Sequence, residues 1–251
     1  MTEWYIYFLS ELVGSILLTF IGGAIMANIF LKGTIGSWEK NNTLRISFGW
    51  AAAVVVAVVI GLMIGGQSHI NMAITMMYIV AGWTKFVGAL WLIPIFLGAQ
   101  ILGFIIGGLL LTILYWESIK KTASDGFGAN VVVVYTSLAA TKSKKSAMLN
   151  EFFSMAIFLV GFAFMVGNYN GILAKGTSFV FLFILVLGVG LAFSGITPGG
   201  INPTKDLVMR MILHLLPIEG KGDTNMKYSW IPVIMPNIAG IVVGIGLRFL
   251  G

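Results

Sequence analysis

The sequence predicts an all-α integral membrane protein with six transmembrane helices and two re-entrant half-helices, arranged as an inverted 3+3 repeat. Three observations predict this fold. Of the 251 residues, 58% are hydrophobic and only 10% are charged, whereas a soluble domain carries about a quarter charged residues. The apolar residues gather in six long runs, and a glycine-rich break followed by an asparagine occurs at matching places in the two halves of the chain.

Six apolar runs account for the predicted transmembrane helices. Most of them reach the length of about 20 residues that crosses a hydrocarbon core of about 30 Å. A soluble helical core is the alternative, but runs of this kind have no polar face to present to water. The runs are Tyr5–Phe30, Leu44–Ile64, Leu90–Tyr115, Ala147–Val166, Thr177–Phe193 and Trp230–Leu250.

The chain reads as two related halves. Each half opens with an apolar helix that contains one glutamate, Glu11 in the first and Glu151 in the second. Each half later contains a glycine-rich break followed by an asparagine, Asn71 or Asn202. Because each half holds three spans, the second half enters the membrane with inverted topology, a plan found in transport proteins whose site lies at the repeat interface. The expected organisation is a first repeat over residues 1–116, a polar inter-repeat loop over residues 117–146 and a second repeat over residues 147–251.

Both asparagines precede apolar stretches that are too short to span a membrane. The stretch after Asn71 ends near Gly82, and the stretch after Asn202 ends near Leu216. Irregular backbone at membrane depth is tolerated where protein buries it or where it lines a water-filled cavity. Two such segments in matching positions therefore indicate a pathway through the membrane. The alternative is that each asparagine only caps a core helix, which explains one asparagine well and two in symmetric positions poorly.

Two motifs carry a resemblance to a known family. The segment Gln67–Ala73 stands where the aquaporin (major intrinsic protein) family has Ser-Gly-Ala-His-Leu-Asn-Pro-Ala, and the segment Gly200–Leu207 stands at its second motif. Leu215–Gly222 and Tyr228–Val233 extend the similarity, and the chain resembles the glycerol uptake facilitators within this family. The resemblance implies a passive channel in the plasma membrane, a multi-pass chain with cytoplasmic termini, and a homotetramer.

The resemblance assigns roles to the residues around the two asparagines. Asn71 and Asn202 would cap half-helices that meet at mid-membrane and would point amide N–H groups at passing water or hydroxyl oxygens. The half-helix N-termini would bring partial positive charge to this point, which opposes cations. Glu11 and Glu151 would accept hydrogen bonds from the re-entrant loops, and His69 would support the same loops without binding a metal.

Four positions form the family's narrowest point, and they correspond here to Trp50, Gly190, Gly199 and Lys205. An aromatic face opposite a cation makes an amphipathic slot. The carbon edge of glycerol contacts the ring, while its hydroxyls find hydrogen-bond donors on the other side. Gly190 adds room to this slot.

Two of these filter positions depart from the family's pattern. Lys205 replaces an arginine, so that a rigid fork of five donors becomes a flexible point charge. Gly199 replaces the usual aromatic residue, which removes a wall. We therefore expect a wider and less selective filter than is usual in the family, although Asp206, which follows Lys205, matches the glycerol-conducting branch.

The two motifs depart from the family as well. Met72 and Ala73 stand where the first motif normally has Pro-Ala, and Thr204 follows Pro203 where the second motif normally has alanine. Met72 raises the alternative of a non-conducting membrane scaffold, in which its side chain plugs the pore.

The sequence leaves several functions open. The first is a passive channel for glycerol and other small polyols, with water as a further permeant. An alternative facilitator for weak monocarboxylic acids such as lactate, or for urea-type solutes, is motivated by Lys205 and the opened wall at Gly199. A coupled transporter would need a titratable group on the pathway, and apart from Glu11 and Glu151 the spans offer none. We see no enzyme constellation, and we expect no cofactor and no nucleic-acid partner.

The basic residues bear on the orientation. The net charge is +6, from 15 Lys and Arg residues against 9 Asp and Glu residues. With cytoplasmic termini, most of the basic residues fall on the outer side, whereas the positive-inside rule alone predicts the reverse. Their place in membrane loops points to the headgroups of the lipid bilayer as their partners.

Overall fold

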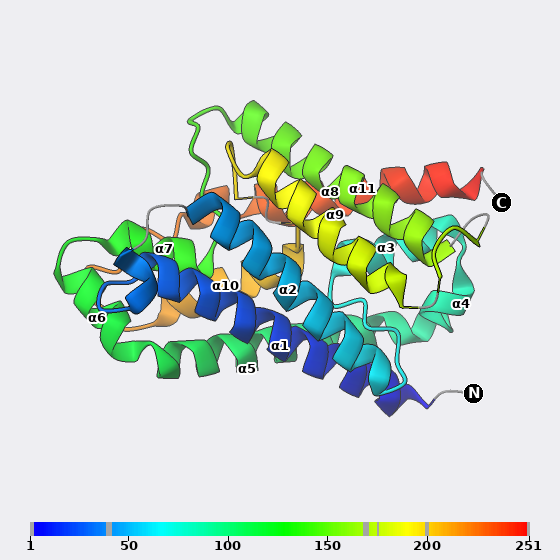
Figure 1. The fold of residues 1–251 in the computed structure, drawn as a ribbon, viewed down its shortest axis with the longest axis horizontal. Coiled ribbons are helices and arrows are strands. Elements are labelled where there is room, and N and C mark those ends of the chain that lie inside the picture. The colour runs from blue at the N-terminus through cyan, green and yellow to red at the C-terminus, as the bar shows by residue number, and fades with distance from the viewer. Residues whose placement is uncertain (1–2, 39–41, 168–170, 175, 199–200, 250–251) are drawn as a thin grey trace.

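The computed structural model describes residues 3–38, 42–167, 171–174, 176–198 and 201–249, and every regular element within these ranges is a helix. The long helices lie along one common direction, and α1 begins at the same end of the bundle at which α11 ends (Figure 1). The predicted all-α architecture is confirmed. The long helices are α1 (Trp4–Phe30), α2 (Asn42–Met63), α5 (Ile93–Leu114), α8 (Lys144–Gly167), α9 (Thr177–Phe193) and α11 (Trp230–Arg248).

These helices match the predicted spans to within a few residues at each end. Five of them, two counted with an adjoining 3-10 turn, are long and apolar enough to cross a membrane. The sixth, α9, has 17 residues, which corresponds to about 25 Å of helix. It contacts both α2 and α8, so it belongs to the same bundle. The adjoining turns are Leu90–Leu92 and Met226–Tyr228, and a further 3-10 turn, Ile35–Trp38, follows α1.

Two short helices, α3 (Met72–Ala81) and α10 (Pro203–Leu215), begin inside the bundle, each directly after one of the two asparagines. The first lies against α11 and the second against α5. Gly240 and Gly244 let α11 approach α3 closely, because a Cβ at either position would meet a backbone oxygen of α3. Both short helices are re-entrant half-helices of the kind that the sequence predicts. A one-turn helix, α4 (Thr84–Val87), follows α3.

The segment between the halves is more structured than a simple polar loop. Within residues 117–146 lie most of α6 (Trp116–Ser124) and all of α7 (Gly128–Tyr135). α7 packs against α1 and α10, and most of the side chains of residues 131–135 are buried. Leaving the side chains of four valines and a tyrosine in water costs more free energy than burying them. This part of the segment therefore folds onto the bundle.

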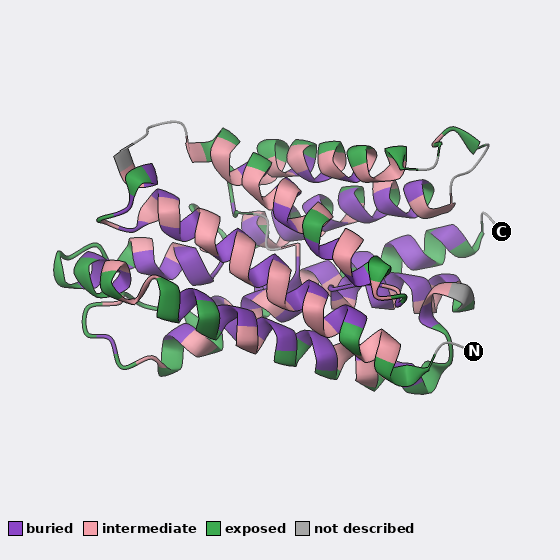
Figure 2. Ribbon diagram, turned by 60° about the horizontal axis from the view of Figure 1, so that its bottom comes forward, coloured by how far each residue is buried: buried purple, intermediate pink, exposed green. Residues whose placement is uncertain are grey.

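The long helices carry both buried and exposed residues along their length (Figure 2), and large apolar residues occur in both classes. On α8, the exposed ones form a stripe at a spacing of three or four residues, which places them on one helix face. A continuous apolar face of this kind is stable against lipid rather than against water. The chain is therefore a multi-pass membrane protein. The stripe consists of Leu149, Phe153, Ile157, Val160 and Phe164.

Gly103 of α5 tests the close packing of α1 against α5. A Cβ at this position would lie 2.6 Å from the carbonyl oxygen of Leu12 and 2.6 Å from the Cβ of Ser15. We expect Gly103→Ala to push the two helices apart and to lower the free energy of unfolding by about 1–3 kcal/mol, the usual cost of overpacking. The measurement is the midpoint of thermal unfolding in detergent. The control is Gly98→Ala on the same helix, where a Cβ meets nothing within 4 Å; equal shifts in both variants would contradict this role of Gly103.

Candidate functional site

Glu11 holds the backbone that leads into α3. Its carboxylate is fully buried on α1 and accepts hydrogen bonds from the backbone N–H groups of His69 (2.5 Å) and Ile70 (2.7 Å). A third hydrogen bond comes from Nε2 of Gln100 on α5, at 2.9 Å. Buried N–H groups of irregular backbone need such acceptors, because no water reaches them inside a bilayer. Glu11 is thus placed as a structural anchor with both carboxylate oxygens engaged.

His69 fixes the same segment through its side chain. Its Nε2 lies 2.9 Å from the carbonyl oxygen of Phe86, and its Nδ1 lies 3.0 Å from Oγ1 of Thr75. Because a carbonyl oxygen can only accept, Nε2 carries the proton and Nδ1 accepts from the threonine. The ring also stacks on Phe96 at 4.6 Å between centroids. Both nitrogens are used, and within the described part of the chain no group of three side chains is placed to hold a metal ion.

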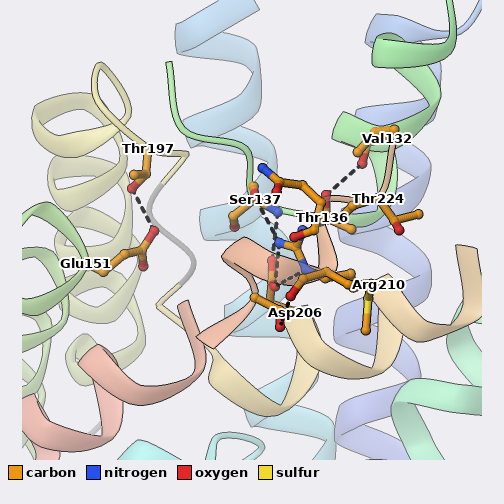
Figure 3. Close-up of polar contacts among 11 residues, drawn as sticks. Val132, Thr136, Ser137, Glu151, Thr197, Asp206, Arg210 and Thr224 are labelled. Carbon is orange, nitrogen blue, oxygen red and sulfur yellow. Dashed lines mark hydrogen bonds and ion pairs between the residues drawn. The ribbon is translucent and has the colours of Figure 1, made fainter. Parts of the chain in front are cut away.

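The second half holds its loop with a related set of side chains. Glu151 is fully buried on α8 and accepts a hydrogen bond from Oγ1 of Thr197 at 2.7 Å (Figure 3). Nδ2 of Asn150 donates to the same threonine oxygen at 2.7 Å and to the carbonyl oxygen of Phe193 at 3.0 Å. These bonds tie α8 to the segment that connects α9 with α10. Each half therefore carries one fully buried glutamate that accepts hydrogen bonds from the segment before its half-helix.

Both asparagines cap the half-helices that follow them. Oδ1 of Asn71 accepts a hydrogen bond from the N–H of Ala73 at 3.0 Å. Oδ1 of Asn202 accepts one from the N–H of Lys205 at 3.1 Å, and Pro203 occupies the first position of α10. The first N–H groups of a helix have no partner within it, which is why asparagine is favoured there. The caps orient both carboxamides and bring the partial positive charges of two helix N-termini to one place.

Reciprocal hydrogen bonds join the two loops between the half-helices. Nδ2 of Asn71 donates to the carbonyl oxygen of Ile201 at 2.8 Å. Nδ2 of Asn202 donates to the carbonyl oxygen of Ile70 at 2.7 Å. Both isoleucines have left-handed φ angles, 45° for Ile70 and 32° for Ile201, and this conformation costs about 1–3 kcal/mol per residue. The hydrogen bonds from the two asparagine side chains offset this cost. Each carboxamide keeps one further N–H that can donate to a solute.

A cavity of about 130 Å³ lies beside this junction and is lined by both asparagines. Trp50, Gly190 and Lys205 line it as well, so three of the four predicted filter positions line the same cavity. Nζ of Lys205 lies 4.3 Å from the centre of the Trp50 ring, a cation–π arrangement. The ring packs on Gly22 of α1, where a Cβ would collide with it. The fourth predicted position, Gly199, lies outside the described residues.

The departures in the two motifs lie away from the cavity. Met72 begins α3 and is partly buried, but it is not among the described residues that line the cavity. The same holds for Ala73, Pro203 and Thr204, which are buried in the first turns of the two half-helices. The structure thus gives no support to a Met72 plug, and the departures from the family's motifs lie in the first turns of the half-helices.

A buried ion pair that the sequence analysis did not find supports the cavity wall. Asp206 and Arg210 are both fully buried, with Nη2 2.8 Å and Nε 3.1 Å from the same carboxylate oxygen. The other oxygen of Asp206 accepts from the N–H of Ser137 at 2.7 Å. Arg210 also donates to the carbonyl oxygens of Ser137 (2.9 Å) and Thr224 (2.6 Å) (Figure 3). The pair therefore fixes the segment after α7, of which Ser137 lines the cavity, and the loop before α11.

Comparison with known proteins identifies the family. Residues 2–246 match the family described as Major intrinsic protein. The chain belongs to the major intrinsic protein family. A "Probable glycerol uptake facilitator protein" of Mycoplasma genitalium is 32% identical over 250 residues, covering 97% of this chain and 93% of that protein. A Thermotoga maritima protein of the same name is 32% identical over 94% of this chain and 95% of its own length. The glycerol uptake facilitator protein of Bacillus subtilis is 27% identical over 95% and 82% of the two chains.

The fold agrees with a solved structure. The X-ray structure of the aquaglyceroporin from Plasmodium falciparum matches with a TM-score of 0.80 at 24% sequence identity, covering 96% of this chain and 94% of that one. The aquaporin-like fold that the sequence predicts for this major intrinsic protein is therefore confirmed.

Removing the Glu11 carboxylate tests its role as an anchor. Glu11→Ala leaves the N–H groups of His69 and Ile70 and the amide of Gln100 without their acceptor, and each unsatisfied buried donor costs about 1–3 kcal/mol. We expect a large drop in the thermal unfolding midpoint in detergent. Glu3→Ala is the control, because Glu3 is exposed at the start of α1 and makes no capping hydrogen bond. A Glu11→Ala protein that melts like the wild type would exclude the anchor role.

The Asp206–Arg210 pair predicts strong coupling between two substitutions. Arg210→Met leaves a buried carboxylate without its cation, which costs about 3–5 kcal/mol. Adding Asp206→Asn removes that charge, so we expect the double variant to be more stable than Arg210→Met alone. The measurement is a double-mutant cycle on the free energy of unfolding in detergent. Simple additivity of the two losses would show that the ion pair does not hold this wall.

Proposed function

We propose that this protein is a passive channel for glycerol and other small neutral solutes, and that water passes through it as well. The observation that carries the proposal is the slot formed by Lys205 over Trp50, which borders the cavity that contains both asparagines. The flexible stem of Lys205 lets the ammonium group move off the ring, and the slot then offers an aromatic face to the carbon edge of glycerol and an ammonium donor to its hydroxyls. The names of the relatives from M. genitalium, T. maritima and B. subtilis support the same solute.

Beyond the slot, a solute meets the asparagine pair. Asn71 and Asn202 each spend one N–H on the opposite loop, so each keeps one N–H that can donate to a hydroxyl or water oxygen. The two helix N-termini make this place electropositive, which opposes cations. The cavity wall also carries apolar residues such as Val54 and Val186. A polyol therefore finds few hydrogen bonds at a time and is not held tightly, as rapid conduction requires.

The other functions receive less support. No carboxylate is found among the described residues that line the cavity, both ring nitrogens of His69 are bonded to protein, and Glu11 has both oxygens engaged as an anchor, so the described lining gives a coupled transporter no carboxylate to protonate. The hypothesis of a non-conducting scaffold loses its support, because Met72 is not among the described residues that line the cavity. The charge of Lys205 would suit weak acids, but the names of the relatives favour glycerol over weak acids and urea. We also propose that the protein is not an enzyme.

We further propose that the channel is a homotetramer in the plasma membrane with cytoplasmic termini, and that its repeats span residues 1–116 and 147–251. Membership of the major intrinsic protein family supports these proposals. In this orientation the end of the bundle opposite the termini faces outward, with a surplus of basic side chains that can contact lipid headgroups. The exposed or partly exposed lysines at this end include Lys32, Lys120, Lys121, Lys142, Lys144 and Lys145.

Stopped-flow light scattering on proteoliposomes tests the proposed function. Vesicles with and without the protein are challenged with a glycerol gradient. A passive channel predicts fast re-swelling that does not saturate with glycerol concentration and that has a low activation energy. Re-swelling no faster than that of empty liposomes would overturn the glycerol proposal, and lactic acid, urea and water would then be tested in the same apparatus.

Lys205→Arg tests the slot. The rigid guanidinium fork replaces a flexible point charge, so we expect the permeability ratio of glycerol to a bulkier polyol to rise, by about tenfold at most. The control is Lys144→Arg, an exposed residue that does not line the cavity. Unchanged relative permeabilities in Lys205→Arg would remove Lys205 from the filter.

A further inference from the structure

Toward the chain termini, the cavity ends in a ring of apolar side chains. Val58 of α2, Phe162 of α8 and Leu182 of α9 line it, and on each helix this residue is the last lining residue in that direction. Each also lies five positions from the end of its helix that is nearest the termini. The three side chains therefore mark the end of the described cavity lining on three helices, and we name them the apolar collar.

Aromatic neighbours hold Phe162 in place. Its ring stacks on Phe158, with 5.7 Å between centroids and 21° between planes. On another side it meets Tyr78 of α3 at 6.4 Å, and Tyr78 in turn stacks on Phe86 at 4.9 Å. Phe162 is only 7% exposed and Tyr78 only 3%. A ring packed in this way cannot move aside without disturbing α3, so the collar is a fixed constriction rather than a flexible one.

The collar offers no hydrogen bond to a solute. Its three members are hydrocarbon side chains. Of the polar side chains beside them, the ring of His69 is bonded to protein through both nitrogens. The hydroxyl of Ser68 is buried without a hydrogen-bond partner among the described residues and lies against Gly61, between α1 and α2. A solute must therefore shed water here without a side-chain replacement, and hydrophobic constrictions exclude hydrated solutes by this cost.

We propose that the apolar collar is a second selective constriction, in series with the slot of Lys205 and Trp50, and that Phe162 sets its width. The inference rests on the proposed function as a channel for small neutral solutes. The slot selects by hydrogen bonding, whereas the collar selects by size and by the cost of dehydration. Polyols longer than glycerol, which carry more hydroxyls and more bound water, are the solutes that the collar rejects.

Phe162→Ala and Phe162→Leu test this proposal in proteoliposomes by stopped-flow light scattering. The solutes are glycerol, a four-carbon polyol, a five-carbon polyol and water. We expect the permeability of the longer polyols relative to glycerol to rise by about tenfold in Phe162→Ala, the effect of a few methylene-sized contacts, and by less in Phe162→Leu. Phe153→Ala is the matched control, because Phe153 lies on the same helix, is 50% exposed and does not line the cavity.

The outcomes separate the collar from the channel itself. If the wild type conducts glycerol and the Phe162 variants keep its permeability ratios, the collar is overturned while the proposed function stands. If the wild type does not conduct glycerol, the proposed function fails, and the water permeability of the same vesicles decides on the collar. A rise in Phe162→Ala over wild type then supports the constriction, and an unchanged value overturns it. Size-exclusion chromatography and helix content show whether each variant is folded. If Phe162→Ala does not fold, Phe162→Leu, which leaves a smaller void, replaces it in the test.

Discussion

Irregular backbone at membrane depth must find its hydrogen-bond partners inside the protein, and the rest of this structure depends on that constraint. The loop before α3 meets it through Glu11, whose carboxylate takes two backbone N–H groups. The two loops then satisfy each other, because Asn71 and Asn202 each donate to the carbonyl that precedes the other asparagine. These bonds fix one half-helix relative to the other. The cavity, the caps and the two helix dipoles keep their places only because this junction is closed.

The two half-helices carry different side chains after their asparagine caps, and this difference gives the channel two unlike ends. The second half carries Lys205 in the first turn of its half-helix, and the adjacent Asp206 pairs with Arg210 to hold the wall after α7. The first half carries no cation at the corresponding place: its half-helix begins with Met72 and leads to the aromatic packing around Tyr78. A polar slot and an apolar collar thus arise from one duplicated plan.

The sequence predicts best what depends on local pattern. The spans follow from apolar runs, and the half-helices from Asn71 and Asn202 as caps, because both signals lie within a few neighbouring residues. Gln100 could have been noticed as a polar residue inside an apolar run, and Arg210 as the partner of Asp206 one helical turn away. The contact of Arg210 with Ser137 has no such signal, since it joins residues far apart in the chain. The collar also depends on residues of three separate helices that line one cavity, which periodicity within each helix does not reveal.

The chemistry of Lys205 explains why a second constriction matters. Its ammonium group sits on a flexible stem, and the contact with the Trp50 ring holds it over the aromatic face. A slot of this kind adapts to solutes of different size. It therefore selects solutes by their hydroxyl groups more strongly than by their width. Phe162, stacked on Phe158, cannot adapt in the same way. Recognition of hydroxyl groups and discrimination by size therefore lie at different places along the cavity, and a polyol accepted at the slot but too wide for the collar returns to the side from which it came.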